Sequence, residues 1–448
     1  MRNGSESRWL GGGIAIALHD RITAAALGGA LCLLIAGCQG GSAAPAASAT
    51  GASASPTAAG MRLSITPAGG TSHVNPAKGI TVTAAGGKIS GVTVQLAASH
   101  LPGALTGIVN GAVNGTLNAA RTRWHSTWTL SPSARYTVTA KAVSRSGQAV
   151  TQTSSFRTLR PARTFQTQIF EGYHKTYGVG MPIMLTFSQP ITDKPAVERS
   201  LELWTSKPVV GAWYWDGDTS LSFRPRGYWP AHTKVTFTGN LDGVEGAPGL
   251  YGMHTLTQSF TIGRSLIVVA STATHHMKVY RNGKLFSHWP ISTGRPGDNT
   301  PNGTYLTIDK GNPVLMKGPG YRLEVPWSVR FTWTGDYLHD AFWSVGEQGF
   351  TNVSHGCVNM APADAETYYK MELPGDPVTV SGSPRAGQWD NGWTQWFLSW
   401  PKLLRGSALH EAVQAGPDGS TFVSPSSLPA ATLSPPLSAP PAGNWAPS

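Results

Sequence analysis

Apolar and polar residues alternate along the first half of the chain, in short runs that glycine and proline separate. Between residues 61 and 159 these runs include ITVTAA, SGVTVQLAA and RYTVTAKAVS, and residues 161–263 repeat the theme with LSFRP and KVTFT. Strands of this length at regular spacing are typical of β-sandwiches. The pattern predicts a mainly β fold that begins with two tandem sandwich domains, 61–160 and 161–263.

These two domains have the strand spacing of immunoglobulin-like domains but lack a pair of cysteines for a core disulfide. We expect them to act as spacers, with a polymer-binding surface as the alternative. A third β-rich unit is predicted over 264–382. Its hairpin signal is Asn282-Gly283, PADAETYYKM predicts a helix over Pro362–Met371, and residues 377–382 predict a closing strand.

Tryptophans mark the following segment, 383–415. Trp389, Trp393, Trp396 and Trp400 are spaced by 4, 3 and 4 residues, which places them on one face of a helix. Such a helix docks on the third unit or, alternatively, offers a sugar-stacking platform. Residues 416–448 are rich in Pro, Ala and Ser and predict a disordered tail.

The amino terminus contains an uncharged, mostly apolar run over 22–36, which has the length of a signal-peptide core and is shorter than a membrane span. It ends at Ile35-Ala36-Gly37-Cys38, which resembles the bacterial lipobox; a chance cysteine is the alternative. The resemblance implies a signal peptide at 1–37, a lipid on Cys38 and a flexible tether over 38–60. An exported, membrane-anchored protein is expected.

Composition and charge narrow the chemistry. Three cysteines are too few for a disulfide framework or a four-thiolate zinc site, and loss of Cys32 with lipidation of Cys38 leaves Cys357 as the free thiol. The net charge is +11 without a basic cluster, which argues against nucleic acid. His275-His276 and His410-Glu411 lack metal partners at ligand spacing, so neither a metal nor another cofactor is expected.

The segment Ser354-His355-Gly356-Cys357-Val358-Asn359 combines a hydroxyl, an imidazole, a glycine and the thiol, and His339 lies upstream. A cysteine nucleophile needs a base that is adjacent in the fold, although not in the sequence. Glycine before Cys357 allows a substrate to approach closely. The backbone N–H groups of Gly356 and Cys357 are therefore candidates for an oxyanion hole.

These motifs, together with Thr300-Pro-Asn-Gly-Thr-Tyr305 and Val325-Pro326-Trp327, resemble the L,D-transpeptidase catalytic domain over residues 266–381. Members of that family have a β-rich catalytic domain and cross-link bacterial peptidoglycan. The lipoprotein signal and the tandem immunoglobulin-like domains resemble the actinobacterial members. The resemblance implies an enzyme that is held at the cell membrane and faces the cell wall.

The resemblance also implies the roles of individual residues. Cys357 is the nucleophile and His339 its base and later acid, oriented by the backbone carbonyl of Asp340. An acid is unusual at that position, and whether its side chain raises the pKa of His339 is open. The supporting and substrate-binding residues are His355, Ser354 and Asn359 in the cysteine loop, Tyr321 in the lid and Trp343 as an aromatic wall on the acceptor side.

The implied reaction joins two peptidoglycan stem peptides. A tetrapeptide donor acylates Cys357 and releases D-alanine, and the diaminopimelate amine of an acceptor stem then forms a 3→3 cross-link. Carbapenem β-lactams are expected inhibitors. The alternatives are an L,D-carboxypeptidase, in which water is the acceptor, and a non-catalytic wall-binding lipoprotein.

Overall fold

The structure, a computed structural model, describes residues 60–97, 109–110, 113–318 and 321–428. The predicted signal peptide, Cys38, all but the last residue of the predicted tether, and the tail beyond residue 428 lie outside the described residues. Within the described part of the chain, no helix is long and apolar enough to cross a membrane. Strands far outnumber helices, which confirms the mainly β class.

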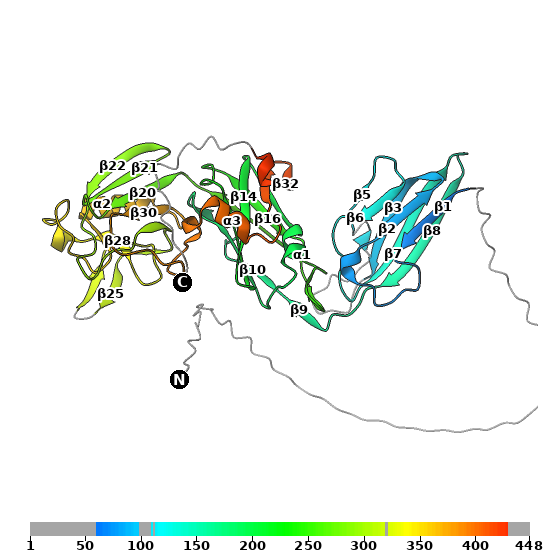
Figure 1. Ribbon diagram of the computed structural model, residues 1–448, viewed down its shortest axis with the longest axis horizontal. Coiled ribbons are helices and arrows are strands. Elements are labelled where there is room, and N and C mark those ends of the chain that lie inside the picture. The colour runs from blue at the N-terminus through cyan, green and yellow to red at the C-terminus, as the bar shows by residue number, and fades with distance from the viewer. Residues whose placement is uncertain (1–59, 98–108, 111–112, 319–320, 429–448) are drawn as a thin grey trace, which may run out of the picture. The chain divides into compact units, whose positions relative to one another are not determined.

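The first domain is a sandwich of two four-stranded sheets (Figure 1). Its strands are β1 (Arg62–Thr66), β2 (Thr81–Ala85), β3 (Gly87–Ala97), β4 (Val109–Asn110), β5 (Gly115–Leu117), β6 (Arg123–Ser126), β7 (Arg135–Ser144) and β8 (Ala149–Arg157). The sheet orders are β1-β2-β6-β5 and β4-β3-β7-β8. Along β7, Tyr136, Val138, Ala140 and Ala142 are buried at every second position, as the alternating sequence predicts.

The second domain is also a sandwich, with a short helix α1 (Lys194–Arg199). Its strands are β9 (Arg163–Phe165), β10 (Thr167–Ile169), β11 (Thr176–Tyr177), β12 (Ile183–Phe187), β13 (Leu201–Thr205), β14 (Val209–Asp216), β15 (Ser220–Pro225), β16 (Lys234–Gly239), β17 (Glu245–Ala247), β18 (Leu250–Gly252) and β19 (Leu256–Ile262). One sheet has the order β11-β19-β16-β13, and the other contains β10-β12-β15-β14.

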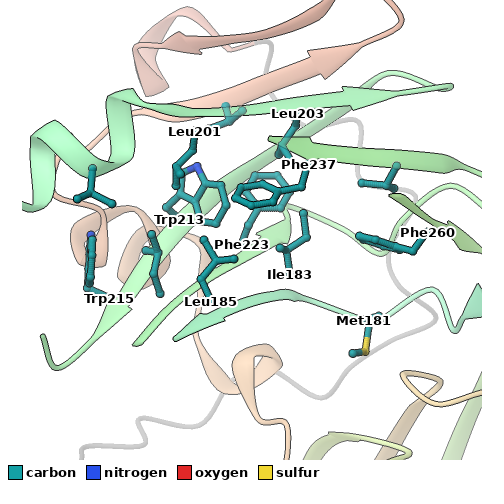
Figure 2. Close-up of a cluster of buried hydrophobic side chains, with 14 of the residues drawn as sticks. Met181, Ile183, Leu185, Leu201, Leu203, Trp213, Trp215, Phe223, Phe237 and Phe260 are labelled. Carbon is teal, nitrogen blue, oxygen red and sulfur yellow. The ribbon is translucent and has the colours of Figure 1, made fainter. Parts of the chain in front are cut away.

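Aromatic side chains fill the space between these two sheets (Figure 2). Trp213 from β14 packs against Phe223 from β15 and Phe237 from β16, with ring centroids 5.3 and 6.0 Å away. All three side chains are at most 1% exposed. Each buried aromatic ring removes about 150–250 Å² of surface from water. This aromatic core therefore stabilises the domain where other sandwiches use a disulfide.

The end of the described chain returns to the second domain. Strand β31 (Ala412–Gly416) pairs antiparallel with β14, and β32 (Gly419–Val423) pairs with β31. Figure 1 shows β32 in red in the second domain, at the end of the sheet order β14-β31-β32. The prediction of a disordered tail from residue 416 is wrong for residues 419–423. The reason is that β14 has an edge without another partner, and this hairpin satisfies its backbone groups.

The predicted tryptophan helix is also wrong. Only Trp400 begins a helix, α3 (Trp400–Gly406), and a separate 3₁₀ turn covers Gln395–Phe397. Gly392 adopts a φ of 132°, which interrupts any helix that would join Trp389 to Trp393. Proline at position 401 fits the first turn of a new helix but not the interior of a longer one.

Each of the first three tryptophans has its own partner on the second domain. The indole N–H of Trp389 donates to the Asp216 carboxylate over 3.1 Å, and that of Trp396 donates to the Gly180 carbonyl over 2.7 Å. Trp393 packs edge-on against Phe170, with centroids 5.0 Å apart. The docking alternative is therefore supported over the sugar platform, but the segment contacts the second domain as well as the predicted third one, where Trp393 packs edge-on against Trp333.

The third domain combines a five-stranded sheet, a four-stranded sheet, a hairpin and the helix α2 (Pro362–Met371). Its strands are β20 (Leu266–Ser271), β21 (His276–Arg281), β22 (Lys284–Pro290), β23 (Gly303–Leu306), β24 (Lys310–Gly311), β25 (Val314–Gly318), β26 (Tyr321–Val325), β27 (Ser328–Arg330), β28 (Tyr337–Asp340), β29 (Val358–Met360) and β30 (Pro377–Ser381). The orders are β22-β21-β20-β30-β23 and β24-β27-β28-β29.

Three local predictions are confirmed in this domain. Arg281 pairs with Lys284 across Asn282-Gly283, both of which have positive φ, as the hairpin signal requires. Helix α2 has the predicted bounds, and β30 is the predicted closing strand. The second sheet carries the candidate site on its neighbouring strands β28 and β29.

Candidate active site

Two parallel strands bring the predicted histidine and cysteine together. In the pairing of β28 with β29, Leu338 lies opposite Val358 and His339 opposite Asn359. Cys357 immediately precedes β29, so strand spacing and rise place its α-carbon roughly 8 Å from that of His339. A thiol and an imidazole can span that separation. The sheet register therefore creates the pair from residues that are distant in the sequence.

His339 is held as a neutral base. Its Nδ1 lies 2.7 Å from the backbone oxygen of Asp340, which is the contact that the resemblance implies. Because a carbonyl only accepts, Nδ1 carries the ring proton and Nε2 is left unprotonated. Burial lowers the pKa of His339 to about 4, and the Asp340 carbonyl contact offsets part of that shift. The imidazole is therefore uncharged at pH 7 and able to accept a proton.

The side chain of Asp340 does not raise the pKa of its neighbour His339 above the ordinary value. Its Oδ1 is buried without a hydrogen-bond partner among the described residues. Burial raises the pKa of the Asp340 carboxyl. The sequence left open whether the Asp340 side chain raises the pKa of His339. Loss of water around the imidazole is the larger effect, and it lowers that pKa despite the adjacent acid.

Cys357 is held as a neutral thiol. Its Sγ lies 3.8 Å from the carbonyl oxygen of Gly335, in the turn before β28. Burial, and next the nearby Asp336, raise the pKa of Cys357 to about 12, while the Tyr337 backbone lowers it. With His339 also neutral, the resting pair is thiol and imidazole, not thiolate and imidazolium. The thiol must lose its proton as it attacks.

The loop before Cys357 is fixed by hydroxyl groups. Ser354 Oγ donates to the carbonyl of Cys357 over 2.6 Å and accepts from the Gly356 N–H over 3.2 Å. The Gly356 N–H therefore already has a partner within the loop, and its role in the oxyanion hole stays a prediction. Thr300 Oγ1 donates to the Gly356 carbonyl over 2.7 Å. That bond orients the peptide whose N–H belongs to Cys357, the other backbone candidate.

The other predicted residues surround this loop. Asn359 is buried, and its amide donates to Ser344 Oγ over 2.9 Å. The ring of Tyr321, at the start of β26, lies 5.2 Å from that of His355, so the hairpin β25–β26 contacts the cysteine loop. Partial burial, and then the proximity of Cys357 and Asp298, raise the pKa of Tyr321.

Trp343 forms a wall beside the base. Its ring stacks on that of His339, with centroids 5.9 Å apart and an angle of 28° between the ring planes, and the residue is 45% exposed. The neighbouring Phe342 is 60% exposed. A substrate that approaches His339 from this side therefore meets an aromatic surface, in keeping with the wall that the resemblance implies.

Three functional neighbours were not assigned from the sequence: Thr300, Asp336 and Asn391. Thr300 belongs to a motif that the sequence did reveal, but its hydrogen bonds could not be inferred from it. Asp336 has the appearance of an ordinary turn residue in Thr334-Gly335-Asp336. Asn391 pairs with Thr334 in both directions, with two bonds of 2.9 Å, although it lies in the segment after the catalytic domain.

The histidines considered for metal binding lie elsewhere. His275, in the turn between β20 and β21, has Nδ1 3.0 Å from Asn352 Oδ1, and His276 Nδ1 is 2.7 Å from the Thr274 carbonyl. Among the described residues, no group of three or more His, Cys, Asp or Glu side chains has the spacing of a metal site. His410 lies two residues before the strand β31, not on a zinc-binding helix.

The fold and the site thus define a multidomain β protein in which a half-buried cysteine lies near a buried histidine, a combination of the kind used in acyl transfer. Residues 265–380 match the model of the L,D-transpeptidase catalytic domain, and residues 71–245 match a bacterial Ig domain. The Ig match spans parts of both sandwich domains.

Relatives with names agree with these matches. L,D-transpeptidase 2 of Mycobacterium tuberculosis is 32% identical over 292 residues, which are 61% of this chain and 71% of the relative. L,D-transpeptidase 1 of the same species is 37% identical over 215 residues, 46% of this chain and 80% of the relative. A solved LD transpeptidase in complex with imipenem is 35% identical and covers 49% of this chain and 100% of its own, with a TM-score of 0.42. The chain belongs to the L,D-transpeptidase family.

Proposed function

We propose that this protein is a peptidoglycan L,D-transpeptidase that forms 3→3 cross-links through a thioester on Cys357. The observation that carries the proposal is the position of Cys357, directly before the strand that pairs in parallel with the strand of His339, whose Nδ1 is bonded to the Asp340 carbonyl. Membership of the L,D-transpeptidase family supplies the substrate class. Peptidoglycan stem peptides are thus both donor and acceptor in cell wall biogenesis.

In the first half-reaction, the donor is a tetrapeptide stem. As Cys357 Sγ attacks the carbonyl carbon of the third residue, His339 Nε2 takes the thiol proton. The bond from that carbonyl to D-alanine then breaks, and the imidazolium returns the proton to the departing amine. The products are a thioester and free D-alanine. Because the thiol starts uncharged, general-base assistance is built into this step.

Negative charge develops on the carbonyl oxygen during attack. The Cys357 N–H is the backbone donor that the Thr300 hydrogen bond orients. The Tyr321 hydroxyl comes from the hairpin that contacts His355 and is the proposed second donor. A tyrosine hydroxyl is protonated at neutral pH, and partial desolvation raises the pKa of Tyr321 further. Preorganised donors of this kind stabilise the tetrahedral intermediate.

In the second half-reaction, the side-chain amine of diaminopimelate on another stem attacks the thioester. His339 Nε2 accepts the amine proton, and the Cys357 thiolate leaves and is reprotonated from the imidazolium. Trp343 lines the approach to the base and is the proposed acceptor wall. The product is an amide between two third residues, and the enzyme returns to its thiol–imidazole state.

Lipid attachment at Cys38 is proposed to hold the enzyme at the outer face of the cell membrane. The two immunoglobulin-like domains then act as spacers that carry the catalytic domain into the wall. Removal of the lipidated cysteine is the direct test. Cys38→Ser protein is expected in the soluble fraction of cells, whereas the unaltered chain is expected with the membranes.

Incubation with a carbapenem followed by mass spectrometry tests the nucleophile. We expect one covalent adduct, on the peptide that contains Cys357, and none on Cys357→Ala protein. Absence of an adduct, or an equal adduct on the variant, refutes the catalytic role and favours a wall-binding lipoprotein. Incubation with tetrapeptide stems then distinguishes the two possible activities. Dimers support the transpeptidase, while D-alanine release without dimers supports the carboxypeptidase.

A further inference from the structure

A second buried acid lies beside the nucleophile, in the turn between β27 and β28. Asp336 is 6% exposed and has no part in the proton transfer proposed between Cys357 and His339. Its Oδ2 accepts hydrogen bonds from Thr332 Oγ1 over 2.8 Å and Thr334 Oγ1 over 3.4 Å. Its backbone N–H donates to Thr332 Oγ1 over 2.8 Å. Burial of a carboxylate costs free energy, which hydrogen bonds of this kind partly offset.

The carboxylate packs directly on the glycine before Cys357. A β-carbon at Gly356 would lie 2.4 Å from Asp336 Oδ1, and Gly356 has a φ of 129°. Asp336 therefore occupies the space that any other residue at position 356 would need for its side chain. Two different residues thus restrain the backbone at Gly356: Asp336 contacts it, and Thr300 donates a hydrogen bond to its carbonyl.

The turn that carries Asp336 is itself anchored by the segment after the catalytic domain. Asn391 accepts from the Thr334 N–H and donates to the Thr334 hydroxyl, each over 2.9 Å. Burial raises the pKa of the Asp336 carboxyl, while the Thr332 hydroxyl, then Arg385 in the same segment, and then the Thr334 hydroxyl offset part of that shift. These contacts keep the acid in place against Gly356.

Charge links the acid to the thiol. Negative charge on Asp336 is the second cause, after burial, of the raised pKa of Cys357. The other titratable or charged groups around the pair are Arg385, Tyr305, Tyr321, Tyr337, His339, His355 and Asp298. Asp298 is the other carboxyl group among them and is partly exposed, whereas Asp336 is buried. Low exposure strengthens the electrostatic effect of Asp336 on the thiol.

We propose that Asp336 is a positioning residue for the Cys357 nucleophile, acting through the Gly356 backbone and through its negative charge beside the thiol. It keeps the resting cysteine protonated, so that the thiolate forms only when His339 assists attack on a bound carbonyl. The functional meaning rests on the proposed role of Cys357. The charge effect itself can be measured without substrate.

The experiment compares rates of iodoacetamide alkylation of the Cys357 peptide in the full chain, at several pH values between 6 and 9. Below the thiol pKa, a decrease of one unit accelerates alkylation about tenfold at fixed pH. Asp336→Asn, which removes the charge and preserves the shape, is expected to react about three- to tenfold faster than the unaltered chain. Asp309→Asn, which removes an exposed carboxylate beside Arg330, is the control and is expected to react at the original rate.

Equal rates for Asp336→Asn and the unaltered chain overturn the proposal. Thermal unfolding establishes that each variant is folded, and Asp336→Ser provides a smaller neutral side chain if the amide does not fit. Asp336→Glu restores the charge and is expected to return the slow alkylation. Alkylation needs neither peptidoglycan nor a carbapenem. A failure of the Asp336 proposal therefore shows in the alkylation rates, and a failure of the proposed catalytic role of Cys357 shows in the carbapenem adduct.

Discussion

Replacement of Thr300 by valine removes one hydroxyl that connects two buried backbone groups. Thr300 Oγ1 accepts from the Gly294 N–H over 2.9 Å and donates to the Gly356 carbonyl over 2.7 Å. The residue is 1% exposed, so water cannot replace either bond without a rearrangement. Valine has nearly the same shape and leaves both backbone groups without this partner.

The expected cost follows from those two groups. A buried donor or acceptor that loses its partner costs about 1–3 kcal/mol, so the loss of partners for two groups is expected to lower the free energy of unfolding by about 2–6 kcal/mol. Serine keeps the hydroxyl and loses one methyl group, which costs about 1 kcal/mol. The carbapenem acylation rate is also expected to fall in Thr300→Val, because the Cys357 N–H is no longer held toward the oxyanion.

Urea unfolding and the second-order rate of carbapenem acylation measure these two effects, with Thr300→Ser as the matched control. The reasoning predicts a slow, destabilised valine variant and a nearly normal serine variant. If valine changes the unfolding free energy by less than about 0.5 kcal/mol and leaves the acylation rate unchanged, the hydroxyl does not position the Cys357 peptide.

Three further outcomes are expected. Tyr321→Phe should slow carbapenem acylation by tenfold or more with little change in thermal stability, because the partly exposed hydroxyl is a proposed oxyanion donor; an unchanged rate would exclude that role. Glu198 is fully buried and accepts from Trp215, Ser407 and Ala408, so Glu198→Ala should lower the unfolding free energy by about 3 kcal/mol or more, whereas Glu202→Ala should have a small effect. The pKa of His339 is about 4 when folded and 6.5 as a free side chain, so protonation favours the unfolded chain: its contribution to stability is complete above pH 6.5 and is lost, by up to about 3 kcal/mol, as the pH falls toward 4. His339→Gln should lack this part of the acid-induced loss in parallel urea titrations, and identical pH profiles would contradict the assignment.

Local features were predictable because they depend on neighbours in the sequence. Asn282-Gly283 supports positive φ at both positions, and the proline at position 362 begins a helix at the expected residue. The cysteine and histidine were also recognisable, because thiol chemistry needs a base. Their register on β28 and β29 was not predictable, since strand pairing depends on contacts across the whole domain.

Features that depend on distant partners were missed. The tryptophan spacing has a helical period, but Gly392 and Pro401 break the helix and each ring contacts a different surface. Asp336 reads as a turn residue because the contact with Gly356 arises only when the strands assemble. The hydrogen bond from the Gly356 N–H to Ser354 Oγ likewise could not be read from the sequence.

The return of the chain to β14 makes the second domain discontinuous. The Leu203 N–H donates to Ser420 Oγ across 217 residues of sequence, with the entire catalytic domain between them. When synthesis has reached residue 263, β31 and β32 do not yet exist, and β14 still lacks its outer neighbour. The catalytic domain is thus an insertion within the second domain, and the larger sheet of that second domain is completed only by strands that follow the insertion in the sequence.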